Sequence, residues 1–545
     1  MTSQKSTRST YNRKDIAKFL AAARDSNLSE RAFAKSEGIP KSTMQGWRHI
    51  RANIKQPEEI VDFLEGEVGI DFLKRLVDGI LFHLHESGGA SLNSISVFLK
   101  DMGLADFIAT SPTFLKERAR TLQDQIIAFG VEQVALLNAT MDSRNISIAE
   151  DETFFHGQTI LVAMEPASNY ILVETKVDDR KADTWNTQMD EGLSTLNVNV
   201  IQSCSDQGTS LIKHVEEHLG AESSADLFHI SQDIGRAGSA SLSLQLKKSK
   251  ELLDKEISKT ESIKKEKFKR NEFNEETEKI KISHSQKNEL RMLADHREAQ
   301  QKIKLFKRGR RGVSFHFHPF DIDTGQRQSP EKVEQLIVED MQNCEYAIRD
   351  LSESSHKKLA KAKRLIPKMT ASLKFFFATM SSLLATCKFE QRIKNLIEED
   401  LVPAAYLLLV ANKTKDKKKA QQILDLVAEK RMNFLSICET YRQYSPKDRD
   451  DMWLIAMDIA QVFQRSSSCV EGRNGQLSLK YHNLHRLSDK KLSSLTVLHN
   501  FHIVRSDGTT AAQRFFRRAH PPLFETILKR MPELSRPRKH TKKPA

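Results

Sequence analysis

The spacing of apolar residues predicts helices over most of this chain. Apolar positions recur every three or four residues, which is the pattern of a helix with one buried face. Such helices are predicted within residues 14–50, 58–141 and 330–463. No internal repeat period is evident in these segments.

One segment, which starts at Asn145, follows a different pattern. Apolar and polar residues alternate there, and β-branched and aromatic side chains are frequent, as is typical of strands. Three strands are predicted at 145–150, 158–164 and 169–176, followed by a helix, a strand at 197–206, a second helix and a strand that begins at 224. This order predicts a mixed α/β sheet rather than a doubly wound one.

Residues 239–311 form a long charged segment without proline. Charges of both signs are mixed in it, and its apolar residues are loosely spaced. This composition favours a long helical hairpin or a coiled-coil arm, with a solvated run of charges as the alternative.

Residues 14–50 are expected to form three short helices, with Ser29 and Ser42 as N-terminal caps. A helix, a glycine-containing turn and a second helix make the helix-turn-helix pattern, in which the second helix enters the major groove of DNA. A plain helical hairpin is the alternative. The residues expected to face DNA are Lys41, Ser42, Thr43, Gln45 and Arg48, and those expected in the small core are Phe33, Ile39, Met44 and Trp47.

The net charge is +13 and the isoelectric point is near 9.3, and a basic surplus of this size often marks a polyanionic partner. A basic protein without a nucleic-acid role remains the alternative. The five cysteines are far apart and contain no C-x-x-C pair, which argues against a zinc site or a disulfide framework and fits a reducing cytoplasm.

Membrane and secretion signals are not expected in this chain. No apolar run reaches the roughly 18 residues that a membrane span needs. The N-terminus lacks the apolar region of a signal peptide. The sequence therefore predicts a cytoplasmic protein with no membrane partner.

Three carboxylates are candidate metal ligands. Asp151 is expected at the end of the first strand and Asp206 just after the fourth, where two neighbouring carboxylates repel unless a divalent cation relieves them. Glu471, on a helix that opens near "SSS", would complete an oxygen-only site for two Mg²⁺ ions about 4 Å apart, with Mn²⁺ as a substitute. Such ions activate an attacking oxygen and stabilise a leaving oxygen in phosphodiester chemistry.

Other assignments of these acids stay open. Glu152 is an alternative ligand to Asp151, although it should point to the other face of its strand. Asp226 assists the site or caps a turn, and Asp206 is alternatively a plain turn residue before Gly208. The polar residues expected to meet the DNA backbone or to order Glu471 are Arg473, Asn474, His482, His485 and Arg486.

The order strand-Asp, strand-Asp, long insertion, helix-Glu resembles the DDE transposases of bacterial insertion sequences. The string that begins "SSSCVEGRNGQLSLKYHNLH" looks like the C-terminal block of one such group. The strings "DETFFHGQTILVAMEPASNYILVE" and "SDQGTSLIKHVEEHLGAESSADLFH" resemble its first and second catalytic blocks. The resemblance covers roughly residues 145–240 and 465–517.

The resemblance implies an α+β fold: an RNase H-like mixed sheet interrupted by a large all-α insertion and preceded by an N-terminal helix-turn-helix. The expected parts are 1–55 (helix-turn-helix domain), 56–141 (helical linker), 142–240 (first part of the RNase H-like core), 241–463 (helical insertion with the charged arm), 464–530 (C-terminal part of the core) and 531–545 (basic disordered tail). More than 200 of the residues between Asp206 and Glu471 must then form the inserted helical domain.

The resemblance also implies transposition. Such an enzyme binds double-stranded DNA at terminal inverted repeats, hydrolyses a phosphodiester and joins the freed 3′-OH to target DNA, with Asp151, Asp206 and Glu471 as metal ligands. It implies a nucleoid-associated homodimer. The alternatives are a catalytically inactive DNA-binding protein, either a decayed transposase or a repressor that uses the helix-turn-helix, and an RNase H-like nuclease without strand transfer.

Overall fold

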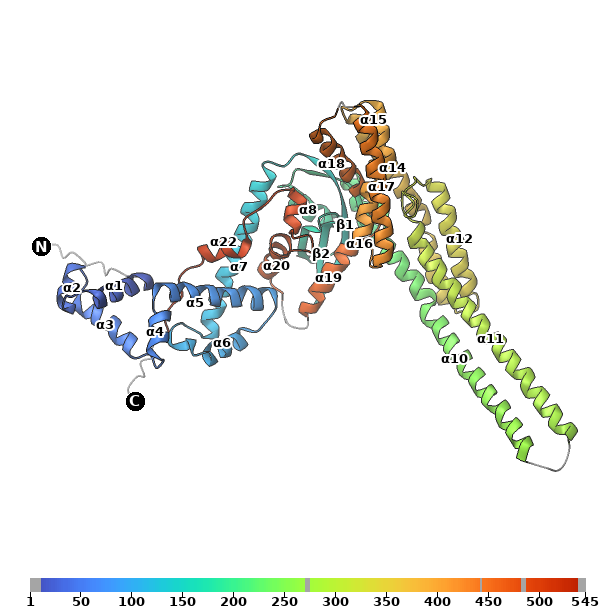
Figure 1. The fold of residues 1–545 in the computed structure, drawn as a ribbon, viewed down its shortest axis with the longest axis horizontal. Helices are drawn as coiled ribbons and strands as arrows, with labels where there is room; N and C mark the ends of the chain where they lie inside the picture. Colours follow the sequence, from blue (N-terminus) through green and yellow to red (C-terminus); the bar gives the residue numbers. More distant parts are fainter. Residues whose placement is uncertain (1–10, 270–274, 442–443, 482–486, 538–545) are drawn as a thin grey trace.

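The computed structural model describes residues 11–269, 275–441, 444–481 and 487–537. The molecule is elongated, with small N-terminal helices at one end, a sheet in the middle and a long helical hairpin at the other end (Figure 1). Residues 538–545 of the tail that the sequence predicts to be disordered lie outside the described residues.

Three short helices begin the described chain: α1 (Arg13–Asp25), α2 (Glu30–Ser36) and α3 (Lys41–Ala52). Ser29 caps α2 as predicted, because its hydroxyl accepts from the backbone N–H of Ala32 at 3.3 Å. The predicted cap at Ser42 is wrong, since α3 already begins at Lys41 and has Pro40 at its cap position. The predicted core of these helices is confirmed, with Phe33, Ile39, Met44 and Trp47 buried together.

The next helices do not form a separate linker. They are α4 (Glu58–Leu64), α5 (Glu67–Gly79), the π-helix η1 (Ile80–Ser87), α6 (Leu92–Asp101), the short 3₁₀ turn η2 (Leu104–Asp106) and α7 (Pro112–Asn138). Their buried apolar side chains belong to the same core as the sheet and as residues 470–534. These helices are therefore part of the body that carries the sheet.

The sheet has five strands in the order β3-β2-β1-β4-β5. β2 lies antiparallel to β1 and to β3, whereas β4 runs parallel to β1 and to β5. Their bounds are β1 (Arg144–Phe155), β2 (Gln158–Glu165), β3 (Tyr170–Val177), β4 (Val198–Ser205) and β5 (Glu222–Ala225). The predicted mixed sheet is confirmed, and its first strand continues five residues beyond the predicted end at 150.

The last predicted strand is mostly wrong. The chain leaves β5 at Ala225 and becomes helical from Leu227. Asp226 favours the helix, because its Oδ1 accepts from the backbone N–H of Phe228 at 2.7 Å in the manner of an N-terminal cap. The expected boundary at residue 241 consequently falls inside a helix.

Helices cover both faces of the sheet. α8 (Ala182–Leu193) packs on β3, next to α9 (Thr209–Lys213) and the π-helix η3 (His214–His218). α19 (Ser468–Tyr481) packs on β1 and β2, and α20 (Asp489–Phe501) packs on β3 and α7. The chain ends with α21 (Ala511–Phe516) and α22 (Leu523–Arg530).

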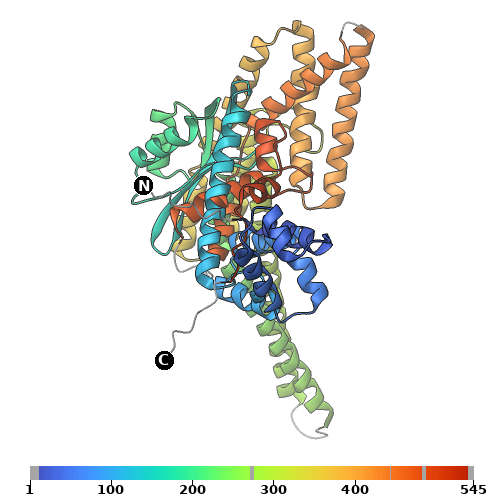
Figure 2. The same ribbon diagram turned by 90° about the vertical axis from the view of Figure 1, so that its left-hand side faces the viewer.

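The buried side chains of a second apolar core all come from residues 225–463, and Ile201 on β4 packs against them. The helical insertion therefore has a core that is distinct from the core around the sheet. The predicted hairpin consists of α10 (Leu227–Lys269) and α11 (Glu275–His316), which project away from the sheet (Figures 1 and 2). The other helices of the insertion are α12 (Pro330–Ile348), α13 (Glu353–Lys363), α14 (Ile366–Thr386), α15 (Gln391–Leu396), η4 (Ile397–Leu401), α16 (Val402–Lys413), α17 (Lys417–Tyr441) and α18 (Pro446–Val462).

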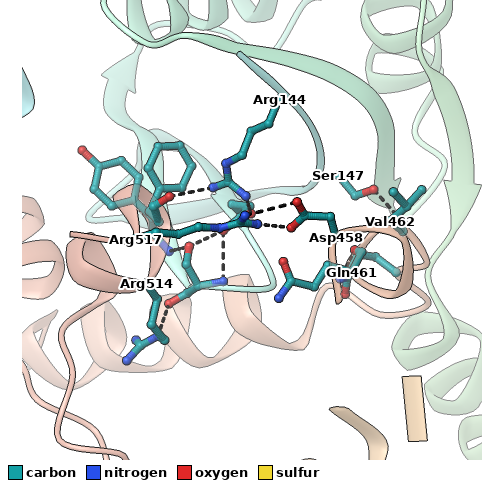
Figure 3. Close-up of polar contacts among 12 residues, drawn as sticks. Arg144, Ser147, Asp458, Gln461, Val462, Arg514 and Arg517 are labelled. Atoms are coloured by element: carbon teal, nitrogen blue, oxygen red, sulfur yellow. Dashed lines mark hydrogen bonds and ion pairs between the residues drawn. The ribbon is translucent and has the colours of Figure 1, made fainter. Parts of the chain in front are cut away.

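The chain returns from the insertion directly onto the sheet (Figure 3). The hydroxyl of Ser147 on β1 donates to the carbonyl of Val462 at the end of α18, at 2.6 Å. Arg517, just after α21, forms an ion pair with Asp458 on α18. These contacts fix the start of α19 beside β1. Among the described residues, no helix is both long and apolar enough to cross a membrane.

Buried His499 on α20 gives the fold a predicted dependence on pH. Burial, together with the nearby charge of Arg473, lowers the pKa of His499 to about 4, while its ring Nε2 lies 2.9 Å from the carbonyl of Asn169. The unfolded chain takes up this proton near pH 6.5, so stability should be complete above that pH and fall as the pH drops toward 4, by roughly 3 kcal/mol. Urea unfolding at stepped pH should show a smaller loss for His499→Asn than for the wild type. Equal losses would remove His499 as the cause.

Candidate metal centre

Asp151 and Asp206 occupy equivalent places on neighbouring parallel strands. β1 and β4 pair up to Ala149 opposite Cys204, and each aspartate lies two residues further along its strand direction. The prediction that Asp151 ends its strand is wrong, because β1 continues past it and pairs there with β2 alone, Asp151 opposite Val162. Asp206 follows the end of β4 as predicted. Both acids therefore lie where the parallel pairing stops.

Glu471 comes to Asp151 on the first turn of α19. The start of this helix is held by Asp226, which accepts the backbone N–H of Ser467 at 3.1 Å and also the Ser467 hydroxyl. One ligand atom each from Asp151, His229 and Glu471 lies within 4.8 Å of the others. Asp151 and Glu471, which the whole helical insertion separates along the chain, therefore lie close together in the fold.

His229 was not among the residues predicted for this site. Its Nε2 lies 3.4 Å from Glu471 Oε1 and 3.6 Å from Asp226 Oδ2. The signal was the spacing of Asp226 and His229, because residues three apart lie on one side of a helix. A strand is predicted over these residues, and in a strand Asp226 and His229 would point to opposite faces, so this spacing does not stand out in the sequence.

The electrostatics of the site disfavour the ionised acids. Burial raises the pKa of Asp151 to about 7; the backbone N–H of Glu152 opposes the rise, and the negative charges of Glu471 and Asp206 add to it. Burial also raises the pKa of Glu471, against the opposing effect of His229. Keeping two buried, neighbouring carboxylates ionised is unfavourable, and a divalent cation bound between them offsets this unfavourable free energy.

Asn474, one turn after Glu471, orders the other acid. Its side-chain Nδ2 donates to Asp151 Oδ2 at 2.9 Å, while the second oxygen of Asp151 accepts the backbone N–H of Glu152 at 2.9 Å. Asp206 Oδ1 accepts the backbone N–H of Gly208 at 2.9 Å, in a turn that brings Gln207 to a φ of +65°. Both aspartates are therefore oriented by fixed donors.

Arg473 is not placed for the expected contact with DNA. Its side chain is buried and forms two hydrogen bonds of 2.6 Å with the carboxylate of Glu174 on β3. The cause is helical geometry: Arg473 points to Glu174 on β3, whereas Glu471 and Asn474 point to Asp151 on β1. His482, His485 and Arg486, the remaining polar residues expected here, lie outside the described residues.

The contacts of Glu152 and Asp226 show whether each of these acids faces the site of Asp151. Glu152 points toward α8, where its oxygens lie 3.4 Å from Arg180 Nη1 and from Trp185 Nε1. It is thus on the opposite face from Asp151. Asp226 both caps α10 and contacts His229.

The predicted DNA-facing residues of the N-terminal helices lie mostly on the surface. Lys41, Ser42, Gln45 and Arg48 are exposed and Thr43 is half-buried. Arg48 also forms an ion pair with Glu30 on α2 at 3.2 Å.

The donor groups fit a divalent cation. Carboxylates suit Mg²⁺ and Mn²⁺, and an imidazole beside them favours Mn²⁺ more than Mg²⁺. The buried Oδ1 of Asn474 has no hydrogen-bond partner among the described residues, which leaves one more oxygen donor beside the cluster.

Comparisons with known proteins give one match. A family model described as a family of unknown function, DUF6399, matches residues 397–543, a range that includes Glu471. No curated protein and no solved structure matches the chain.

Proposed function

We propose that this protein is a DDE transposase with an RNase H-like catalytic core. The observation that carries the proposal is the approach of Glu471 to Asp151 within a single 4.8 Å cluster, although the complete helical insertion separates them along the chain. Proximity of remote acids on a sheet and a helix is what metal-dependent phosphodiester chemistry requires.

The strand arrangement supports the same proposal. Three antiparallel strands are followed by two parallel ones, and Asp151 and Asp206 lie at corresponding positions of the neighbouring strands β1 and β4, although Asp206 is not one of the three residues of the 4.8 Å cluster. The resemblance implies a mixed sheet with aspartates on two of its strands, and this sheet has both features. The order of the three acids along the sequence would by itself be weaker support, because acidic residues are common where strands end.

The residues have separate tasks in the proposed reaction. Asp151, Asp206 and Glu471 would hold the cations, two Mg²⁺ or Mn²⁺ ions, which supply charge for the attacking and leaving oxygens of the phosphodiester. Asn474 keeps Asp151 aimed into the site by its 2.9 Å hydrogen bond. His229, whose Nε2 lies 3.4 Å from Glu471 Oε1, would orient the glutamate toward Asp151 when its ring is protonated.

The direct test uses the full chain and the DNA that flanks its gene. Linear DNA with inverted repeats from those flanks is incubated with the protein and Mg²⁺ or Mn²⁺, together with a supercoiled plasmid. A transposase should nick at the repeat end and join the 3′-OH to the plasmid. Nicking without joined product would indicate a nuclease, and binding without either product would indicate an inactive DNA-binding protein.

In this proposal α3 reads the inverted repeats as the second helix of a helix-turn-helix. The protein would act as a homodimer on two DNA ends and be associated with the nucleoid in the cytoplasm. The exposed Lys41, Gln45 and Arg48 support a DNA-facing surface on this helix.

Two substitutions on α3 should act differently. Lys41→Gln should weaken binding to all DNA and reduce the slope of log K against log salt by about 0.9, because one phosphate contact is lost. Gln45→Ala should cost about 1–3 kcal/mol only at repeats with the recognised base pair. Gel-shift titrations at several salt concentrations measure both effects. Lys35→Gln, an exposed charge change on α2, is the matched control; equal losses for Lys35 and Lys41 would refute a specific role for α3.

A further inference from the structure

A cavity with both polar and apolar walls lies beside the metal centre, between the helical insertion and the start of α19. Its volume is about 380 Å³, within the roughly 300–1,000 Å³ typical of small-molecule sites. Its walls come from the first turn of α10, the end of α11, the end of α16 and the segment that leads into α19. The backbone N–H of Leu227 donates to the carbonyl of Arg465 at 2.9 Å, which joins two of these walls.

Positive charge gathers in this cavity. Lys413 and Arg465 line it, and Arg505 lies close enough to affect Lys413. Burial lowers the pKa of the Lys413 ammonium, and the positive charges of Arg465 and Arg505 lower it further. Among the described residues, no carboxylate is among the charged groups that act on Lys413, so its ammonium lies in the cavity without an acidic partner.

Arg465 is held in place before any ligand arrives. Its Nη1 donates to the carbonyls of Ser314 at 2.9 Å and Phe317 at 3.1 Å, at the end of α11. A guanidinium fixed in this way loses little side-chain entropy when it binds a phosphate. The serine and threonine residues that line the same cavity are Ser231, Ser314, Thr414, Ser466 and Ser468.

An exposed aromatic ring connects the cavity to the metal centre. Phe228 lines the cavity and is 37% exposed, and the next residue, His229, contacts Glu471. An exposed ring beside fixed cations matches the two parts of a nucleotide, since bases stack on aromatic faces and phosphates bind cations.

We infer that this cavity binds one nucleotide of the DNA strand next to the bond that is cut, with its phosphate on Lys413 and Arg465 and its base against Phe228. The inference rests on the proposed function, because it names part of the DNA that the same site acts on. The helical insertion thereby contributes directly to substrate binding, through Lys413 at the end of α16.

The test measures binding without divalent ions, so that no cleavage is involved. A fluorescent single-stranded tetranucleotide is titrated with full-length protein, and anisotropy gives the affinity. Lys413→Gln should weaken binding about 10-fold, as expected for one charge-assisted contact, and Phe228→Ala should weaken it about 5- to 10-fold. Lys413→Arg keeps the charge and should bind within about 3-fold of the wild type.

Lys100→Gln, an exposed lysine on α6, is the matched control and should bind as the wild type does. Thermal melting of each variant shows whether it is folded. Equal affinities for Lys413→Gln and Lys100→Gln, with both folded, would overturn the inference. The binding test and the cleavage test can fail independently. If the protein did not cleave DNA, the proposed function would fail, but binding of the tetranucleotide without divalent ions could still be measured and compared between variants.

Discussion

Asp151→Asn or Glu471→Gln is expected to abolish DNA cleavage while leaving the binding of inverted-repeat DNA unchanged. Each change removes one negative charge from the cluster in which Asp151, His229 and Glu471 meet within 4.8 Å. Loss of a metal ligand should reduce the cleavage rate by about 10³-fold or more, at least as much as loss of one fixed transition-state donor. Binding should survive because α3 is remote from the sheet (Figure 1). Single-turnover cleavage and gel shifts on the same preparations measure the two quantities.

The matched control is Glu152→Gln. This residue neighbours Asp151 but faces α8, where it contacts Trp185 and Arg180. Its cleavage rate should stay within a few-fold of the wild type. Normal cleavage by Asp151→Asn would discard the metal assignment, and loss of cleavage in Glu152→Gln alone would move the ligand role to the other face of β1.

Most of the sheet could be predicted because alternation is a local signal. β2, β3 and β4 lie within about two residues of their predicted bounds. β1 extends further, since its second half pairs only with β2 through a tight turn at His156 and Gly157, both with positive φ. Local alternation shows where a strand is, but not how far a hairpin partner prolongs it.

The site was only partly predictable for a related reason. Asp151, Asp206 and Glu471 stand out as acids at the predicted ends of two strands and at the polar start of a helix, but the approach of Glu471 to Asp151 depends on the path of the insertion. His229 could not be found while the chain after Asp226 was predicted as a strand, because only a helix places these two side chains together.

Arg473 shows the opposite error. A basic residue beside Glu471 in a glycine- and asparagine-rich stretch suggests a phosphate contact, yet it is buried against Glu174. Glu174 lies on β3, far from Arg473 in the sequence, so the residues around Arg473 do not indicate this partner. The pair fixes the rotation of α19, and this rotation decides that Glu471 faces Asp151.

Arg473→Met should therefore destabilise the fold by about 3–5 kcal/mol, because it leaves the carboxylate of Glu174 buried without its cation. In the wild type that carboxylate also accepts the Thr496 hydroxyl at 2.6 Å, which cannot replace a bidentate guanidinium. Glu174→Leu should be comparably destabilising, because it leaves the buried guanidinium of Arg473 without its carboxylate partner. Urea unfolding of the full chain measures both changes.

The double variant Arg473→Met with Glu174→Leu separates a structural role from a role in DNA binding. Replacing a buried ion pair by apolar side chains of similar volume is often neutral, so the double variant should recover most of the stability lost in either single one. Its affinity for inverted-repeat DNA should equal that of the wild type. If Arg473→Met instead kept full stability and weakened DNA binding, the arginine would reach the phosphate backbone after all, and α19 would have to turn relative to the sheet when DNA binds.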